Sequence, residues 1–365
     1  MLTKFEVKGF KGFENLFVLD FSNTREYKFN SDCILKGNIK NLIMYGRNSI
    51  GKSNFGLAIM DIVSHLDDKN IGPKLYENYL NINCDKAEFK YQFRFEDNII
   101  DYHYSKKDLK DLLWETIYVN DKLILTYNYE NKKGDFTGAK KISPTLNYSH
   151  LGDGSLLRYF LTNSALDEKH PLFLFQKFIS SMLWFSTLEE NRYVGYKTKS
   201  DDYYKFILDD KTIQNKFENM LNKIGIKEKL SSRKGLDGKK ELYFKNNNKF
   251  LPFFEVASSG TRALYTLFYW LTTAKNASFI CIDEFDAYYH FELAEQVINI
   301  LKDMPETQSM VTTHNTNLLT NKIMRPDCYF VLTKDRLTCI ANATKMELRE
   351  GHNLEKLYIA GEFNG

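Results

Sequence analysis

The sequence predicts an α/β fold with a core sheet that carries a phosphate-binding loop, an antiparallel β subdomain and a helical insertion. Residues 42–66 are typical of a short apolar strand, a glycine-bounded loop and a helix. Residues 86–129 alternate apolar and polar with the period of a strand, whereas residues 151–225 have the longer apolar period of helices. Because no heptad pattern persists along the chain, we expect no long coiled coil.

Composition narrows the class of protein. Of the 365 residues, 43% are hydrophobic, enough for a packed core, which excludes a disordered or fibrous chain. The net charge of +3 is too small to give an overall electrostatic attraction to nucleic acid, so any contact with DNA would come from local basic patches. The five cysteines form no CxxC pair, and no apolar run approaches the roughly 18 to 20 residues that span a bilayer. We therefore expect a cytoplasmic protein with reduced thiols and no membrane partner.

The alternation in residues 2–21 predicts an antiparallel hairpin at the start of the chain, so that the strands of residues 86–129 would form a second sheet. A basic, glycine-containing segment at residues 231–244 predicts another hairpin. We expect four parts: an N-terminal part of the core (1–85), an antiparallel β subdomain (86–150), a helical insertion (151–245) and a C-terminal part of the core (246–365).

A phosphate-binding loop is the strongest local signal. Residues 46–53 match the pattern GxxxxGK[ST] directly after an apolar strand and directly before a helix. The glycines permit a backbone path whose N–H groups face phosphates, the lysine reaches the β- and γ-phosphates, and the serine hydroxyl binds Mg²⁺. The alternative is a chance glycine turn capped by a serine, which both flanks disfavour. The expected nucleotide contacts are Gly46, Arg47, Asn48, Ser49, Gly51, Lys52, Ser53 and Asn54.

An acidic pair ends a second predicted strand. The apolar run 278–282 leads into Asp283 and Glu284, and the carboxyl ends of such strands line the ligand crevice of an open α/β sheet. Because neighbouring residues of a strand point in opposite directions, we expect separate tasks. Asp283 is assigned to Mg²⁺, and Glu284 to orienting the attacking water or accepting its proton. The alternative is a helix N-cap with acids favoured by the helix dipole.

Two weaker signals complete the set. Ser258, Ser259, Gly260 and Thr261 precede a long apolar helix and predict an anion site at its N-terminus, although such a segment by itself is an ordinary N-cap. His314 follows the strand-like run 310–313, and a single histidine by itself is more often structural.

In this order, GRNSIGKS, ASSGTRAL, SFICIDEFD and VTTHNTN resemble the Walker A, signature, Walker B and switch-histidine motifs of SMC and RecF-like ABC ATPases. The resemblance implies an ABC-type P-loop core in which Ser259 and Gly260 of one protomer close over the γ-phosphate held by another. It implies that His314 senses this phosphate and acts with Glu284 and Lys52 in catalysis.

The same resemblance places the start of the dimer-contact D-loop at Asp286. The chain departs from the family pattern at the usual signature leucine, near Val256 and Ala257, and at Thr261, where Gln or Glu is frequent. Gln92 is the best candidate for the Q-loop glutamine, and the alternative is a solvated side chain on a strand.

The whole chain, with its terminal GHNLEKLYIAGEF, resembles stand-alone bacterial AAA-family ATP-binding proteins of abortive infection and phage defence, namely RloA-like, AbiL-type and PARIS AriA-like ATPases. This implies an ATPase, dimeric or larger, that senses infection and controls a separately encoded effector such as a Toprim-like or RloB-like nuclease. Two alternatives stay open. One is a DNA-binding repair or chromosome-maintenance ATPase that uses the cluster Arg233, Lys234, Lys239 and Lys240. The other is an ATP-binding scaffold with little turnover.

Overall fold

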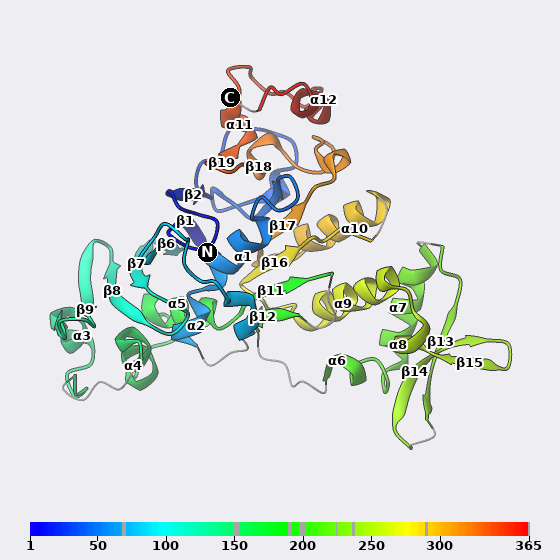
Figure 1. The fold of residues 1–365 in the computed structure, drawn as a ribbon, viewed down its shortest axis with the longest axis horizontal. Coiled ribbons are helices and arrows are strands. Elements are labelled where there is room, and N and C mark those ends of the chain that lie inside the picture. The colour runs from blue at the N-terminus through cyan, green and yellow to red at the C-terminus, as the bar shows by residue number, and fades with distance from the viewer. Residues whose placement is uncertain are drawn as a thin grey trace.

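The computed structural model describes residues 1–67, 71–148, 154–188, 192–196, 202–223, 225–235, 238–288 and 291–363. Its elements form two seven-stranded sheets, a three-stranded meander and helices that cover them (Figure 1). The predicted α/β class with a P-loop core, an antiparallel sheet and inserted helices is confirmed. In this described part the longest helix has 15 residues, so it contains no long coiled coil.

A mixed sheet forms the core. Its strands lie in the order β12 (Tyr193–Gly195), β11 (Met182–Ser186), β16 (Phe279–Asp283), β17 (Gln308–Thr313), β5 (Asn41–Tyr45), β18 (Tyr329–Leu332) and β19 (Leu337–Cys339). The five inner strands pair in parallel, and both edge strands pair antiparallel. Every residue of the inner five is buried, as expected for parallel strands covered on both faces.

The second large sheet is antiparallel throughout, in the order β10 (Lys133–Asp135), β9 (Lys122–Asn128), β8 (Leu112–Val119), β7 (Asn98–Lys106), β6 (Ala87–Phe95), β1 (Leu2–Lys8) and β2 (Phe17–Asp20). The predicted N-terminal hairpin and the predicted strands of residues 86–129 are confirmed. The expectation of two separate sheets is wrong, because β1 pairs with β6 in the register Phe5↔Tyr91. Local alternation shows which residues are strands but carries no information about distant pairing.

The inserted helices are α4 (Leu156–Asn163), α5 (Pro171–Ile179), α6 (Asp202–Lys205) and α7 (Lys211–Lys223). The helical prediction is wrong for β11, which pairs with β16 inside the core sheet, and for β12, which pairs with β11 at its edge. A short, continuously apolar run has the same pattern in a buried strand as in a buried helix. The predicted basic hairpin is confirmed as β13 (Lys229–Lys234) and β14 (Lys240–Asn246), and β15 (Lys249–Pro252) extends it to a meander.

The remaining helices are α1 (Lys52–Met60), α2 (Val63–Leu66), α3 (Thr137–Ile142), α8 (Phe253–Val256), α9 (Ser259–Thr273), α10 (Phe291–Lys302), α11 (Ile340–Ala343) and α12 (Leu354–Ile359). Short 3-10 helices lie at 31–33, 73–76, 316–318 and 326–328, and β3 (Ile34–Leu35) pairs with β4 (Asn38–Ile39). Among the described helices, none has the length and apolar character needed to cross a bilayer.

Helix α1 packs closely on the core sheet. A Cβ atom at Gly56 would lie 2.8 Å from Trp184 Nε1 and 2.9 Å from Cys281 Sγ, so a residue without a side chain is needed where α1 crosses β11 and β16. The helix is therefore held at a short distance above the strands that lead to the acidic pair.

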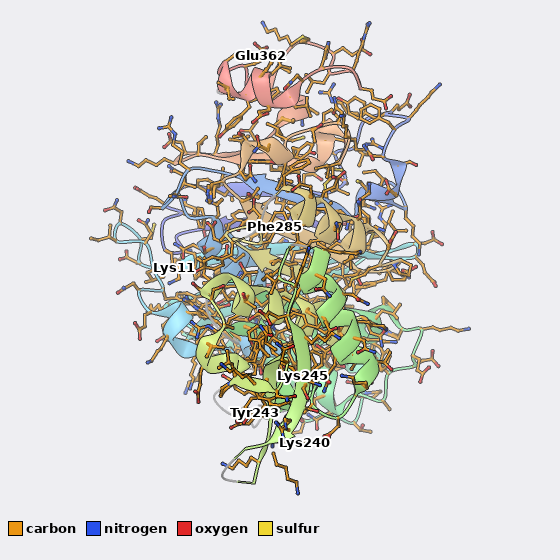
Figure 2. The ribbon with its side chains drawn as sticks, turned by 90° about the vertical axis from the view of Figure 1, so that its right-hand side faces the viewer. Lys11, Lys240, Tyr243, Lys245, Phe285 and Glu362 are labelled. Carbon is orange, nitrogen blue, oxygen red and sulfur yellow. The ribbon has the colours of Figure 1, made fainter. Side chains whose placement is uncertain are left out.

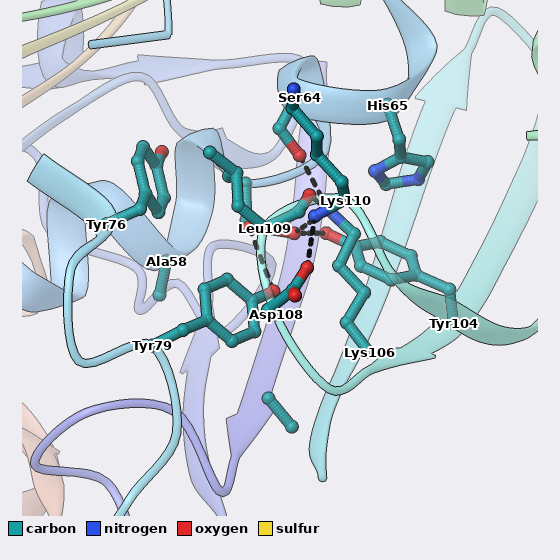
Figure 3. A network of polar contacts seen from close by, with 12 residues as sticks. Ala58, Ser64, His65, Tyr76, Tyr79, Tyr104, Lys106, Asp108, Leu109 and Lys110 are labelled. Atoms are coloured by element: carbon teal, nitrogen blue, oxygen red, sulfur yellow. Dashed lines mark hydrogen bonds and ion pairs between the residues drawn. The ribbon is translucent and has the colours of Figure 1, made fainter. Parts of the chain in front are cut away.

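A buried ion pair joins the end of α1 to the antiparallel sheet. Lys106 Nζ lies 2.8 Å from Asp61 Oδ2, and both side chains are fully buried. Lys106 also donates to Ser64 Oγ and to the carbonyl of Leu109 (Figure 3). The hydroxyls of Tyr79 and Tyr104 donate to Asp61, so the carboxylate has three donors. Burial lowers the pKa of Lys106, and Asp61 opposes that shift.

We expect Lys106→Met to destabilise the fold by about 3–5 kcal/mol, because it leaves a buried carboxylate without its cation. Chemical denaturation measures the change. Lys107→Met is the matched control, since Lys107 is exposed and its pair with Glu130 is 3.4 Å long, so its effect should stay within about 0.5 kcal/mol. Equal stability of the Lys106 variant and the wild type would contradict a structural role for the pair.

Candidate functional site

The phosphate-binding loop connects β5 to α1. A Cβ at Gly46 would lie 2.8 Å from Ile50 Cγ2 and 3.1 Å from the carbonyl oxygen of Leu332, so the loop start requires glycine. Gly51 has φ +108°, a conformation that side chains rarely adopt. Arg47, Asn48 and Ser49 are exposed, and Ser53 and Asn54 are partly buried in the first turn of α1. The first N–H groups of α1 thus adjoin an open loop, which is the arrangement that binds phosphates.

Lys52 is the cation of this loop. Its side chain is 3% exposed, and its ammonium donates to the carbonyls of Gly46 at 3.0 Å and Arg47 at 3.3 Å. The same nitrogen lies 3.4 Å from Glu284 Oε1. The structure therefore brings the predicted lysine and the predicted catalytic carboxylate together.

Sheet topology explains this convergence. Strands β5, β17 and β16 are neighbours and parallel, with Thr313 opposite Tyr45 and Ile282 opposite Val311. Their carboxyl ends lie at one edge of the sheet. The phosphate loop, His314 and the acidic pair each follow one of these three strands, so all of them reach the same edge.

Asp283 lies beside the start of α1. Its carboxylate accepts hydrogen bonds from the hydroxyl of Ser53 and from Thr312 Oγ1, the latter at 2.8 Å. Burial raises the pKa of Asp283, and the two hydroxyl donors oppose this shift. A desolvated carboxylate next to a serine hydroxyl offers only oxygen ligands, which fits Mg²⁺. The described residues contain no cluster of three or more His, Cys, Asp or Glu that could hold a metal, and Mg²⁺ at nucleotide sites needs few protein ligands.

Glu284 has a left-handed backbone with φ +49°. Its carboxylate is 17% exposed and lies 3.4 Å from both Lys52 Nζ and His314 Nδ1. The expectation that neighbouring residues point in opposite directions fails here, because β16 ends at Asp283 and the left-handed turn redirects the next side chain. Both carboxylates face the phosphate loop, yet each has its own partners.

Sequence reasoning missed two residues that contact Glu284. Thr312 Oγ1 accepts from the Glu284 N–H at 2.9 Å, and Thr187 Oγ1 donates to the Glu284 carbonyl at 2.5 Å. Thr312 lies within the segment VTTHNTN, two residues before His314, and this position was a usable signal. Thr187 lies 97 residues from Glu284 in the chain, and no local pattern marks it.

The signature-like segment begins α9, as predicted. Ser258 is the N-cap, and its hydroxyl accepts from the N–H of Thr261 at 3.2 Å. Ser259 is exposed, and a Cβ at Gly260 would lie 3.3 Å from Tyr288 Cβ. Ser258, Gly260 and Tyr288 line a pocket of about 370 Å³ together with residues of α7, α9 and α10.

Helix α9 follows the signature-like segment in the chain. With 15 residues it spans roughly 22 Å, from α8 at its start to the connection into β16 at its end (Figure 1). Gly260 packs against Tyr288, and Lys52 packs against the loop and Glu284. The signature-like segment and the phosphate loop thus have different neighbours in the part of the chain that the structure describes.

The candidates for the Q-loop glutamine and the start of the D-loop, Gln92 and Asp286, both have side chains that form hydrogen bonds within the protein. Gln92 on β6 accepts from Thr3 Oγ1 at 3.1 Å and donates to Asp101 at 3.0 Å, so its amide is used inside the antiparallel sheet. Asp286 accepts from Thr313 Oγ1 at 2.8 Å, and burial raises its pKa.

The matching protein family agrees with a nucleotide-binding core. The family described as "AAA domain, putative AbiEii toxin, Type IV TA system" matches residues 42–320, about three quarters of the chain. No curated protein matches the chain.

Among solved structures, the SMC head bound to the C-winged helix domain of ScpA is 17% identical with a TM-score of 0.45, over 92% of this chain and 97% of that one. The SMC head domain from Thermotoga maritima is 16% identical with a TM-score of 0.42, over 93% and 98%. An Smc head with an extended coiled coil, bound to the C-terminal domain of ScpA derived from Pyrococcus furiosus, is 15% identical with a TM-score of 0.43, over 92% and 95%.

We expect Gly46→Ala to weaken nucleotide binding about tenfold, because the new methyl group forces Ile50 or the backbone at Leu332 to move and distorts the loop. Isothermal titration calorimetry with ATP measures this change. Gly12→Ala is the control, since a Cβ there meets nothing within 4 Å and should leave affinity unchanged. Equal affinities for the two variants would show that the loop tolerates the methyl group.

Proposed function

The chain belongs to the AAA-domain family described as putative AbiEii toxins of type IV TA systems, a family of ATP-binding ATPases, and on that premise we propose that two copies hydrolyse ATP at shared, Mg²⁺-dependent sites. One observation carries the proposal. Lys52, Glu284 and His314, which come from three separate parts of the chain, meet within 3.4 Å contacts at the edge of the core sheet.

Each residue has a role set by its surroundings. The N–H groups of the loop and the Lys52 ammonium bind the β- and γ-phosphates, and Ser53 and Asp283 hold Mg²⁺, which offsets phosphate charge when bound. Glu284 orients a water molecule and accepts its proton as the water oxygen bonds to the γ-phosphorus and the bond to ADP breaks. His314 donates a hydrogen bond toward the γ-phosphate.

A second copy supplies the missing group. Positioning and charge stabilisation account for most catalysis of phosphoryl transfer, so a site open on one side is slow even with ATP bound. Ser259 and Gly260 lie at a helix N-terminus and Ser259 is exposed, so the segment is available to another protomer. A symmetric dimer then forms two sites, each with the loop of one copy and the signature segment of the other.

The physiological role that we propose is the control of a separately encoded effector, such as a Toprim-like or RloB-like nuclease, in bacterial defence against phage. The family description names a toxin–antitoxin system, which supports a function exerted together with a second gene product. ATP binding closes the dimer and hydrolysis releases it, so that occupancy of the two sites sets the state that the effector contacts.

Mixing two inactive variants tests the shared site. We expect Glu284→Gln to bind ATP without hydrolysing it, and Ser259→Arg to disable only the site that its own signature segment completes. In a mixed dimer one site carries both changes and the other carries neither. An equal mixture should recover roughly a quarter of the wild-type rate, because half of random dimers are mixed and each has one intact site. Phosphate release measures the rate.

Two outcomes would contradict this proposal. A mixture no faster than its components would exclude sites shared between protomers, and a Ser259→Arg protein with normal turnover would exclude a role for the signature segment. A wild-type protein that binds ATP without turnover would instead be the ATP-binding scaffold.

A second candidate function is direct binding of nucleic acid. Residues 229–252, which form the meander β13–β15, contain seven basic and two acidic residues and carry a net charge of +5; the rest of the chain carries −2. Leu230 and Leu242 bury one face of the meander, and the opposite face carries Lys229, Arg233 and Lys245. Figure 2 shows Lys245 and Tyr243 on β14 at this end of the molecule.

This face combines cations with aromatic rings. The Arg233 guanidinium lies 3.8 Å from the centre of the Phe250 ring, and both Arg233 and Lys245 are exposed. Because β15 runs directly into α8 and then Ser258, a polymer bound there would act close to the signature segment. Phosphate contacts at such a surface weaken steeply with salt.

We expect Arg233→Glu with Lys245→Glu to weaken binding of a labelled 20-mer duplex, and to lower the slope of log affinity against log salt by about 2. Fluorescence anisotropy between low and physiological salt gives both values. The control is Lys110→Glu with Lys141→Glu. This double variant changes the charge by the same amount, at exposed lysines near the seven-stranded antiparallel sheet. Identical slopes for the two double variants would exclude the meander as a nucleic-acid surface.

A further inference from the structure

Glu284 is held in an unfavourable backbone conformation at the point where the proposed chemistry needs it. Its φ of +49° is left-handed, and in this region the Cβ atom of any residue except glycine crowds the following carbonyl. Such outliers persist only where surrounding contacts determine the conformation. The contacts around Glu284 therefore identify what holds it.

Two threonine hydroxyls contact the backbone of Glu284 from opposite sides of β16. Thr312, on β17, accepts from its N–H at 2.9 Å, and Thr187, directly after β11, donates to its carbonyl at 2.5 Å. Both threonines are buried, at 0% and 2% exposure. Strands β17 and β11 are the two neighbours of β16, so the core sheet itself positions both hydroxyls.

The Thr312 hydroxyl has a second task. It donates its single proton to Asp283 Oδ1 at 2.8 Å while its lone pair accepts from the Glu284 N–H. One buried oxygen thus orients the side chain of the proposed Mg²⁺ ligand and the backbone of the proposed base. The N–H of Thr187 also donates to the Asp283 carbonyl at 3.2 Å, which fixes the end of the strand.

The turn decides where the Glu284 carboxylate points. Along an extended strand, the residue after Asp283 would face the opposite side of the sheet. In the left-handed conformation, Glu284 instead reaches Lys52 and His314, each at 3.4 Å. Loss of the turn would therefore remove the carboxylate from the phosphate loop without changing any residue that contacts the nucleotide.

We propose that Thr312 and Thr187 are positioning residues that hold Glu284 in its left-handed turn and so aim its carboxylate at the attacking water. This assignment rests on the proposed ATP hydrolysis. Neither threonine contacts substrate; they act through Glu284 and, for Thr312, also through Asp283. The proposal makes two separate claims. The catalytic claim is that the two threonine hydroxyls are needed for the rate of hydrolysis. The backbone claim is that Glu284 is held in a left-handed conformation that is unfavourable for any residue except glycine.

The catalytic claim is tested with Thr312→Val, which keeps the shape and removes the hydroxyl, and with Thr312→Ser, which keeps the hydroxyl. Steady-state phosphate release should show kcat reduced tenfold or more in the valine variant, with KM for ATP changed less than about twofold. The serine variant should recover kcat to within about threefold of the wild type. Thr187→Val should lower kcat in the same way, since it removes the other contact.

Thr307→Val is the matched control for loss of a buried hydroxyl. Thr307 precedes β17, is 2% exposed and donates to the carbonyl of Ala277 at 2.8 Å, away from the site. The Thr307→Val variant should have a lower denaturation midpoint, because it loses a buried hydrogen bond, and an unchanged kcat. A Thr312→Val protein that is folded and hydrolyses ATP at the wild-type rate would overturn the catalytic claim.

The backbone claim is tested without nucleotide. Glycine has no Cβ and adopts the left-handed region freely, whereas alanine keeps the steric conflict. Glu284→Gly should therefore unfold at a higher denaturant concentration than Glu284→Ala, the reverse of the usual order at a position with negative φ. An alanine variant as stable as the glycine variant would overturn this claim.

The two tests separate this inference from the proposed function. If the wild-type protein shows no ATP turnover, the ATPase proposal fails and with it the catalytic claim, while the order of Glu284→Gly and Glu284→Ala still decides the backbone claim. If the wild type hydrolyses ATP and Thr312→Val does so equally, the function stands and the positioning role is refuted.

Discussion

Three parallel strands end at one edge of the core sheet, and the whole candidate site depends on this alignment. Because β5, β17 and β16 are adjacent, the phosphate loop, His314 and the acidic pair follow their ends at neighbouring positions. The register holds them there through backbone hydrogen bonds that pair Tyr45 with Thr313 and Val311 with Ile282. A shift of one residue in either pairing would reverse the faces of the strand and separate these groups.

Two buried carboxylates in the described part of the chain, those of Asp61 and Glu115, are compensated by close partners. Asp61 and Lys106 form an ion pair with no exposed surface, and the Asp61 carboxylate accepts from three donors. Glu115, also fully buried, accepts from Tyr102 and Ser155 and from the backbone of α4. Unpaired charges in such places would be strongly destabilising. These contacts order the packing of α1, the antiparallel sheet and α4.

Helix α1 is consequently fixed at both ends. Its first residue, Lys52, lies in the phosphate loop, and the residue after its last turn, Asp61, is bound to the antiparallel sheet. Nine helical residues, about 14 Å, separate the two ends. Gly56 holds the middle of the helix closely against β11 and β16, so the helix is also tightly packed between its two ends.

The sequence by itself determined what depends on neighbours along the chain: the loop at residues 46–53, the strand that ends at Asp283, the helix start at residues 258–261 and the period of the antiparallel strands. Turn chemistry, capping and alternation are local, so a window of a few residues contains them. Tertiary structure alone decided that β1 joins β6, that β11 enters the core sheet and that Thr187 contacts Glu284. These contacts join residues up to 97 positions apart, and their energy comes from packing and burial, which no local pattern encodes.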